Sequence, residues 1–96
     1  MEQVYATAVA YHGFGVLIRG PSGSGKSDLA LRLIEDGAKL IADDQVNISA
    51  VRKELYLSSP DSISGLIEVR GFGVIKIGAV RDIKLRLIVD LDPSYE

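Results

Sequence analysis

The sequence predicts a small α/β domain in which many short strands accompany a single long helix. Residues 15–19 form an apolar, β-branched stretch that is typical of a buried strand, and residues 28–36 carry the spacing of an amphipathic helix. A glycine-rich segment lies between them, so that strand, glycine loop and helix follow one another. Most other apolar runs are short and end at turn residues, which favours strands. A chain of 96 residues accommodates one domain, residues 1–96.

The glycine-rich segment, residues 20–27, fits the pattern of a phosphate-binding loop (P-loop), G-x-x-x-x-G-K-[ST], at every position. Its glycines allow successive backbone N–H groups to surround one anion, and the helix that follows adds the partial positive charge of its N-terminus. The lysine supplies a full charge for the outer phosphates, and the last serine supplies a hydroxyl for Mg²⁺. We therefore predict a nucleotide site formed by Gly20, Pro21, Ser22, Gly23, Ser24, Gly25, Lys26 and Ser27. The loop alone does not name a reaction, because kinases, ATPases, GTPases and transporters all use it.

The elements around this loop follow from alternation and turn residues. One strand is predicted over residues 4–11 and ends at a His12-Gly13 turn, which makes the chain's only histidine a turn residue. The strand over residues 15–19 follows this turn. The helix extends over residues 26–36 and ends before a glycine, as helices commonly do.

In the second half of the chain, the pattern of apolar and turn residues predicts mainly strands. Residues 45–51 and 54–57 alternate around a basic turn and form a β-hairpin, whereas residues 58–61 form a loop because Pro60 interrupts any strand there. Residues 63–69 form a mixed segment. Further strands are predicted over residues 39–42, 74–77 and 85–91.

Composition narrows the class of protein. Acids and bases are interspersed and the formal net charge is −2, which predicts no nucleic-acid partner. The chain has no cysteine, which excludes disulfides and thiolate metal sites and is compatible with a reducing cytoplasm. Since no apolar run approaches the roughly 18 residues of a membrane span, we expect no membrane association. The apolar content of 47% is high for so short a domain and requires either very close packing or a face packed against another chain. We expect a homo-oligomer.

Three further patterns suggest chemistry, each with a plainer alternative. The Asp43-Asp44 pair follows a predicted strand, which brings it beside the P-loop if the strands are parallel; a solvated turn is the alternative. Glu68 and Arg70 precede a glycine bend, which fits either a ligand-contacting loop or a charged hairpin turn. Residues 85–90 form an apolar strand ending in aspartate, as in strands that hold Mg²⁺ in P-loop proteins, although any buried strand ending in aspartate has this pattern.

Taken together, these motifs resemble the catalytic domain of the HPr kinase/phosphorylase family. The resemblance rests on the P-loop and its continuation to residue 31, on Asp36-Gly37, on residues 40–44 (L-I-A-D-D) and on residues 67–75 (I-E-V-R-G-F-G-V-I). It covers nearly the whole chain, and the family's short forms, which lack its separate N-terminal domain, are the most similar. The resemblance implies a strand-rich P-loop fold similar to that of phosphoenolpyruvate carboxykinase, with few helices.

The resemblance also implies an activity. The protein would be a cytoplasmic serine kinase that uses ATP and Mg²⁺ to phosphorylate HPr, the phosphocarrier of the sugar phosphotransferase system. It would thereby regulate sugar transport and carbon metabolism, and family members also run the reverse phosphorolysis. By position, Lys26 becomes the phosphate lysine, and Ser27 and Glu68 become the Mg²⁺ ligands.

The same resemblance assigns roles to the remaining polar residues. Asp44 becomes the base that accepts the serine proton, with Asp43 beside it as support. Arg70 lies in the segment that the family uses for both directions of the reaction. The strand that ends in Asp90 is then expected to belong to the core.

Two departures from the family pattern are visible. Tyr5 stands where the family carries a histidine near the active site, and a phenol does not exchange protons near neutral pH as an imidazole does. The family's later arginine and its Pro/Gly/Arg loop would lie beyond Glu96, so we expect a chain truncated at its C-terminal end. Two alternative functions follow: a nucleotide-binding regulatory remnant without efficient phosphotransfer, and another small P-loop kinase or ATPase.

Overall fold

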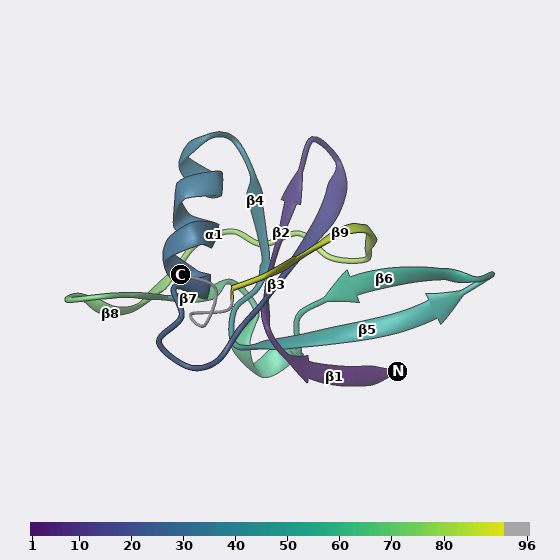
Figure 1. Cartoon of the computed structure of the whole chain (residues 1–96), viewed down its shortest axis with the longest axis horizontal. Helices are drawn as coiled ribbons and strands as arrows, with labels where there is room; N and C mark the ends of the chain where they lie inside the picture. The colour runs from purple at the N-terminus through teal and green to yellow at the C-terminus, as the bar shows by residue number, and fades with distance from the viewer. Residues whose placement is uncertain (92–96) are drawn as a thin grey trace.

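The computed structural model describes residues 1–91, and over these residues it is a mostly stranded, mixed sheet with one α-helix (Figure 1). Short helical and strand segments follow one another with few long loops. The elements are β1 (Glu2–Tyr5), β2 (Thr7–Tyr11), β3 (Phe14–Arg19), α1 (Lys26–Glu35), β4 (Lys39–Ala42), β5 (Gln45–Val51), β6 (Glu54–Ser58), the 3₁₀ helix η1 (Asp61–Ile63), β7 (Leu66–Val69), β8 (Gly73–Lys76) and β9 (Ile83–Asp90).

Seven of the strands described form one sheet in the order β1-β5-β6-β9-β3-β2-β4. Strands β3 and β9 pair in parallel, and the other neighbours in this sheet are antiparallel. Strands β7 and β8 form a separate antiparallel hairpin, which lies beside α1 at the edge of the molecule in Figure 1. No helix within residues 1–91 is long and apolar enough to cross a membrane.

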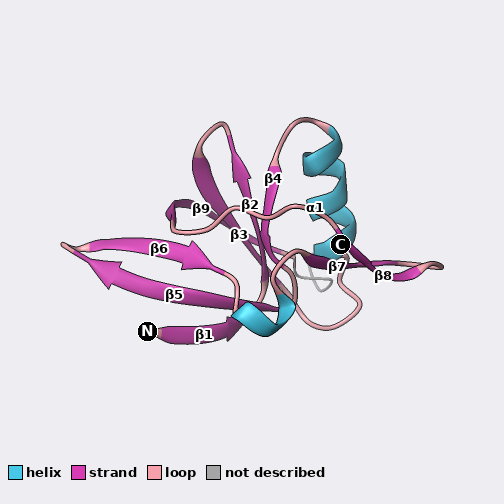
Figure 2. Cartoon of the chain, turned by 180° about the vertical axis from the view of Figure 1, so that it is seen from behind, coloured by secondary structure: helices cyan, strands magenta, loops and turns pink. Residues whose placement is uncertain are grey.

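The core lies on both faces of β2, β3 and β4, because side chains alternate between the faces of a strand. Figure 2 shows α1 and the β5–β6 hairpin on opposite sides of these strands. One face packs against β5 and β6, through Ala8, Ala10, Leu17, Ile41, Ala42, Val46 and Leu57. The other packs against α1 and β7, through Val9, Val16, Ile18, Leu40, Ala30 and Ile67. Strand β3 is buried on both faces, which explains its continuous apolar sequence.

Most predicted elements are confirmed within a residue of their bounds. The predicted strand over residues 39–42 and the predicted hairpin strand over 45–51 coincide with β4 and β5. The two hairpin turns are confirmed as well: His12 and Gly13 adopt φ angles of 52° and 85°, and Arg52 and Lys53 adopt 51° and 68°. Positive φ at both central residues is the geometry that joins twisted antiparallel strands most closely.

The single strand predicted over residues 4–11 is wrong, because the chain forms two strands there. Strand β1 pairs with β5, whereas β2 pairs with β3 and β4 in the other half of the sheet. The break falls at Ala6, whose N–H donates to the carbonyl of Asp44 at 3.1 Å. Ala6 is fully buried, and its small side chain fits where the backbone passes between the two halves.

The expectation that the Asp90 strand belongs to the core is only partly right. Strand β9 lies inside the sheet order, but Leu87 and Ile88 are 50% and 45% exposed. Strand β6 pairs only with Ile83 and Lys84, so the rest of β9 has β3 as its one partner among the strands described. An exposed apolar surface of this kind is compatible with self-association, which remains a prediction.

The end of β9 packs tightly against the start of the glycine loop (residues 20–25, between β3 and α1). A Cβ atom added to Gly20 would lie 2.5 Å from the Ser24 hydroxyl oxygen and 2.7 Å from the carbonyl oxygen of Leu91. We predict that Gly20→Ala lowers the free energy of unfolding by about 1–3 kcal/mol, because this space is already filled. Chemical denaturation measures the effect. Gly78→Ala is the matched control, since its Cβ meets nothing within 4 Å, and a loss as large as that of Gly20→Ala would contradict the packing argument.

Candidate functional site

Three strands bring their carboxyl ends to one edge of the sheet. Strands β3 and β4 both run antiparallel to β2, so they run in the same direction, and β9 is parallel to β3. The glycine loop leaves the end of β3, and Asp43-Asp44 leaves the end of β4. The sequence prediction that the acid pair lies beside the loop depended on parallel strands, and this condition is met. Ligands of α/β sheets commonly bind at such an edge.

The glycine loop ends in a helix N-terminus that carries no side-chain cap. Gly23 and Gly25 adopt φ angles of 81° and 98°, which other residues rarely adopt. Gly25 is the N-cap of α1, and the N–H of Leu29 donates to its carbonyl at 2.9 Å. The amides between these two residues precede the first helical hydrogen bond, so their N–H groups are available to an anion.

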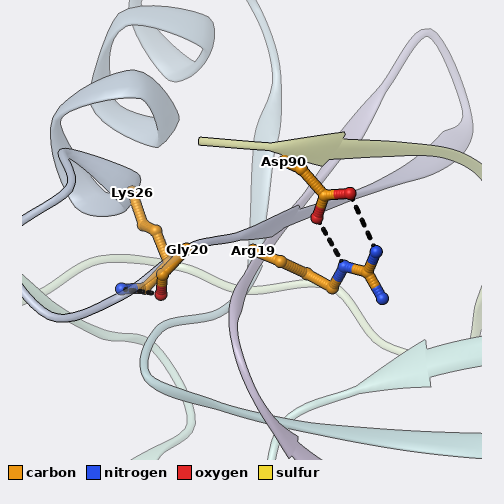
Figure 3. A network of polar contacts seen from close by, with 4 residues as sticks. All are labelled: Arg19, Gly20, Lys26 and Asp90. Carbon is orange, nitrogen blue, oxygen red and sulfur yellow. Dashed lines mark hydrogen bonds and ion pairs between the residues drawn. The ribbon is translucent and has the colours of Figure 1, made fainter. Parts of the chain in front are cut away.

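The side chain of Lys26 turns back over the glycine loop. Its ammonium donates to the carbonyl oxygens of Gly20 at 3.0 Å and Pro21 at 3.1 Å, and the first of these contacts is visible in Figure 3. The residue is only 5% exposed, and within residues 1–91 its ammonium forms no ion pair. A buried cation without a carboxylate partner is a favourable place for an anionic ligand.

Asp43 connects three elements through its carboxylate. Its Oδ1 atom accepts hydrogen bonds from the hydroxyls of Thr7 on β2 and Ser27 on α1, both at 2.8 Å. Its Oδ2 atom accepts from the N–H of Glu68 on β7 at 3.0 Å. Asp43 is 5% exposed, and donors occupy both of its oxygens, so its geometry suits support of the neighbouring groups rather than proton transfer.

Asp44 has different surroundings from its neighbour. It is exposed, its φ is 72°, and its side chain lines a pocket of about 250 Å³. Aspartate is among the residues that tolerate this backbone conformation best. The pocket gathers most of the predicted site residues, and its lining consists of Tyr5, Ser22, Gly23, Gly25, Lys26, Ser27, Asp28, Asp44, Glu68 and Arg70. Gly20, Pro21, Ser24 and Asp43 are not among the lining residues.

The charges of the pocket are mixed. Lys26 and Arg70 face the same space as Asp28, Asp44 and Glu68. No cluster of three or more acidic, histidine or cysteine side chains suited to hold a metal is found in the part of the chain that the structure describes. The predicted Mg²⁺ ligands, Ser27 and Glu68, nevertheless supply a hydroxyl and a carboxylate at one pocket. Mg²⁺ is commonly bound by one or two such oxygens together with substrate phosphates and water, so this donor set fits the ion.

Asp90 does not belong to this pocket. Its carboxylate faces the guanidinium of Arg19, with Nε at 2.7 Å and an Nη nitrogen at 2.9 Å, as Figure 3 shows. This hydrogen-bonded pair lowers the pKa of Asp90 and raises that of Arg19. Because the two residues lie at the ends of β9 and β3, the ion pair joins these strands just before the glycine loop begins.

Sequence analysis did not predict the contacts that two residues make at the site. Thr7 is fully buried and donates to Asp43, and the signal for it is a lone hydroxyl within an otherwise apolar strand. For Tyr5, the family resemblance implies a position near the active site but no partner, and the structure places the centre of its ring 4.3 Å from the Lys26 ammonium nitrogen. No feature of the sequence indicates that contact, because the two residues lie in separate elements.

The fold and the site together define a mixed-sheet protein in which a glycine loop, the lysine at the start of the single described α-helix and acidic side chains from several elements face one pocket. Residues 1–91 match the family described as "HPr Serine kinase C-terminal domain", and the chain belongs to this family.

Its relatives include the HPr kinase/phosphorylases of Bacillus cereus (strain B4264) and Bacillus anthracis (strain A0248), each 42% identical over 97 residues. These alignments cover 93% of this chain and 31% of the relatives, so the chain spans about a third of their length. A solved structure, the HPr(Ser) kinase/phosphatase from Coxiella burnetii, is 27% identical with a TM-score of 0.88. It covers 100% of this chain, which matches 63% of that chain.

We predict that Thr7→Val lowers the free energy of unfolding by about 1–3 kcal/mol, because the swap keeps the shape but removes a donor to a buried carboxylate. Urea denaturation of the purified chain measures it. In an Asp43→Ala background the same substitution should cost less than about 0.5 kcal/mol, since its acceptor is then absent. Equal losses in both backgrounds would show that Thr7 acts through packing alone.

Proposed function

We propose that this chain is the phosphoryl-transfer part of an ATP-dependent protein serine kinase that acts on the phosphocarrier HPr, with phosphorolysis as the reverse reaction. The observation that carries the proposal is the Lys26 ammonium, which is buried at a helix N-terminus, lacks an ionic partner among the described residues and faces a pocket with acidic groups. The names of the relatives, HPr kinase/phosphorylase, support the choice of reaction and protein substrate.

On the nucleotide side, the glycine loop acts as the P-loop. Its free N–H groups and the N-terminus of α1 bind phosphate oxygens, and Lys26 neutralises the outer phosphates. For this contact the Lys26 ammonium exchanges at least one of its hydrogen bonds to Gly20 and Pro21 for a bond to a phosphate oxygen. Charge-assisted bonds of this kind are stronger than bonds to neutral carbonyls.

A divalent cation explains the mixed charges of the pocket. Asp28, Asp44 and Glu68 would repel a triphosphate if no cation lay between them. Ser27 and Glu68 would hold Mg²⁺, which supplies positive charge for the phosphate oxygens when bound.

On the acceptor side, Asp44 takes the proton of the substrate hydroxyl, because it is exposed to the pocket and carries no hydrogen-bonding partner on its side chain among those described. Asp43 supports this arrangement without lining the pocket, since its hydrogen bonds orient Ser27 and the backbone at Glu68. Arg70 faces the same pocket and supplies a positive charge for the transferred group.

One observation favours a second candidate function. Tyr5 stands where the family carries a histidine, and this departure supports a nucleotide-binding regulatory module that transfers phosphate poorly or not at all. Incubation with HPr and γ-labelled ATP separates the candidates. Labelled HPr supports the kinase, bound ATP without product supports the regulatory module, and free labelled phosphate supports another P-loop ATPase.

We predict that Lys26→Ala weakens the binding of Mg·ATP by roughly 10- to 100-fold, because a full positive charge facing the phosphates is lost. Isothermal titration calorimetry measures the dissociation constant. Lys39→Ala is the matched control, since Lys39 is an exposed lysine outside the pocket. Unchanged binding by Lys26→Ala would refute the phosphate-loop assignment.

We predict that Asp44→Asn keeps Mg·ATP binding within a fewfold but lowers the rate of HPr phosphorylation by about 10²-fold or more, as expected for loss of a positioned base. Asparagine tolerates the positive φ of this position, so the backbone is preserved. Glu68→Gln should instead raise the Mg²⁺ concentration needed for half-maximal activity.

Steady-state kinetics at varied Mg²⁺ separate these two effects, with Asp61→Asn as an exposed control on η1. If Asp44→Asn chiefly abolishes nucleotide binding and spares turnover, the division of roles between the two acids is wrong.

A further inference from the structure

Tyr5 lies against the lysine of the glycine loop. It is the last residue of β1, and its ring centre is 4.3 Å from the Lys26 ammonium nitrogen, within the range of a cation–π contact. The residue is 48% exposed and lines the same pocket as Lys26. The tyrosine therefore forms part of the wall of the proposed phosphate site.

The ring completes the surroundings of the ammonium. A lysine ammonium has three N–H donors, and two acceptors are provided by the carbonyls of Gly20 and Pro21. The Tyr5 ring supplies a π face as the third partner. With these contacts Lys26 is 5% exposed although it pairs with no carboxylate in the described chain.

The backbone holds the ring in this position. Tyr5 is paired with Gln45 in the β1–β5 ladder, and the N–H of the next residue, Ala6, donates to the carbonyl of Asp44. The chain segment that carries the ring is therefore attached to the residue that carries the proposed base. The backbone on both sides of the ring is therefore fixed relative to the pocket.

We propose that Tyr5 is a positioning residue for Lys26: the face of its ring holds the ammonium over the glycine loop, ready for phosphate. The inference rests on the proposed function of Lys26. The contact requires an aromatic face and not a hydroxyl or a titratable group, because the interaction is between a cation and the ring quadrupole. A phenylalanine at position 5 should therefore retain the contact with the Lys26 ammonium, whereas an aliphatic side chain of similar bulk should lose it.

The experiment compares Tyr5→Phe and Tyr5→Leu with the unmodified chain by calorimetric titration with Mg·ADP. We expect the dissociation constant of Tyr5→Phe to stay within about twofold and that of Tyr5→Leu to rise about three- to tenfold. Tyr56→Leu is the matched control, since Tyr56 lies on β6 and lines no part of this pocket. A thermal unfolding curve for each variant shows whether it is folded.

A second measurement detects the contact without nucleotide. The methylene protons next to the Lys26 ammonium should show an upfield ring-current shift in NMR spectra of the unmodified chain and of Tyr5→Phe, and Tyr5→Leu should abolish it. Loss of the shift in Tyr5→Phe, its retention in Tyr5→Leu, or equal nucleotide affinity of Tyr5→Leu and the unmodified chain would overturn the proposal. If the unmodified chain binds no nucleotide, the proposed function fails, and the ring-current shift alone then decides whether Tyr5 positions Lys26.

Discussion

The hydrogen bonds to Asp43 are the interaction on which the arrangement of the site depends. This one buried carboxylate accepts from Thr7 on β2, Ser27 at the start of α1 and the backbone of Glu68 on β7. Buried carboxylates are costly without donors, and buried donors are costly without acceptors, so each group stabilises the others. The start of α1, the end of β4, and strands β2 and β7 are thereby held in fixed positions around the pocket.

The same region contains an opposite and uncompensated charge. Lys26 is buried against two carbonyls and an aromatic ring, without an ion pair in residues 1–91. These contacts are enough to hold an ammonium in place, but they do not neutralise it. An anion that enters the pocket gains from a cation that is already oriented, which is the arrangement that phosphoryl transfer requires.

Two adjacent aspartates obtain different surroundings from the end of a single strand. Asp43 is buried, whereas Asp44, whose φ is positive, is exposed and lines the pocket. Their hydrogen bonding differs accordingly: donors occupy the oxygens of Asp43, and the side chain of Asp44 faces solvent. Two chemically identical groups therefore differ in access: Asp43 is covered by its donors and Asp44 is open to the pocket, which is the basis of the separate roles proposed for them.

The sequence by itself determined the local elements: β3, the glycine loop, α1, β4 and the β5–β6 hairpin, since alternation, glycine positions and turn residues act over a few residues. It also placed Lys26, Asp44 and Glu68 at candidate positions. Only the tertiary structure decided the break at Ala6, the exposure of β9 and the contact of Tyr5 with Lys26. These features depend on which distant strands pair and on which elements cover them. Because the contacts join residues far apart in the chain, a short stretch of sequence carries no pattern that indicates them.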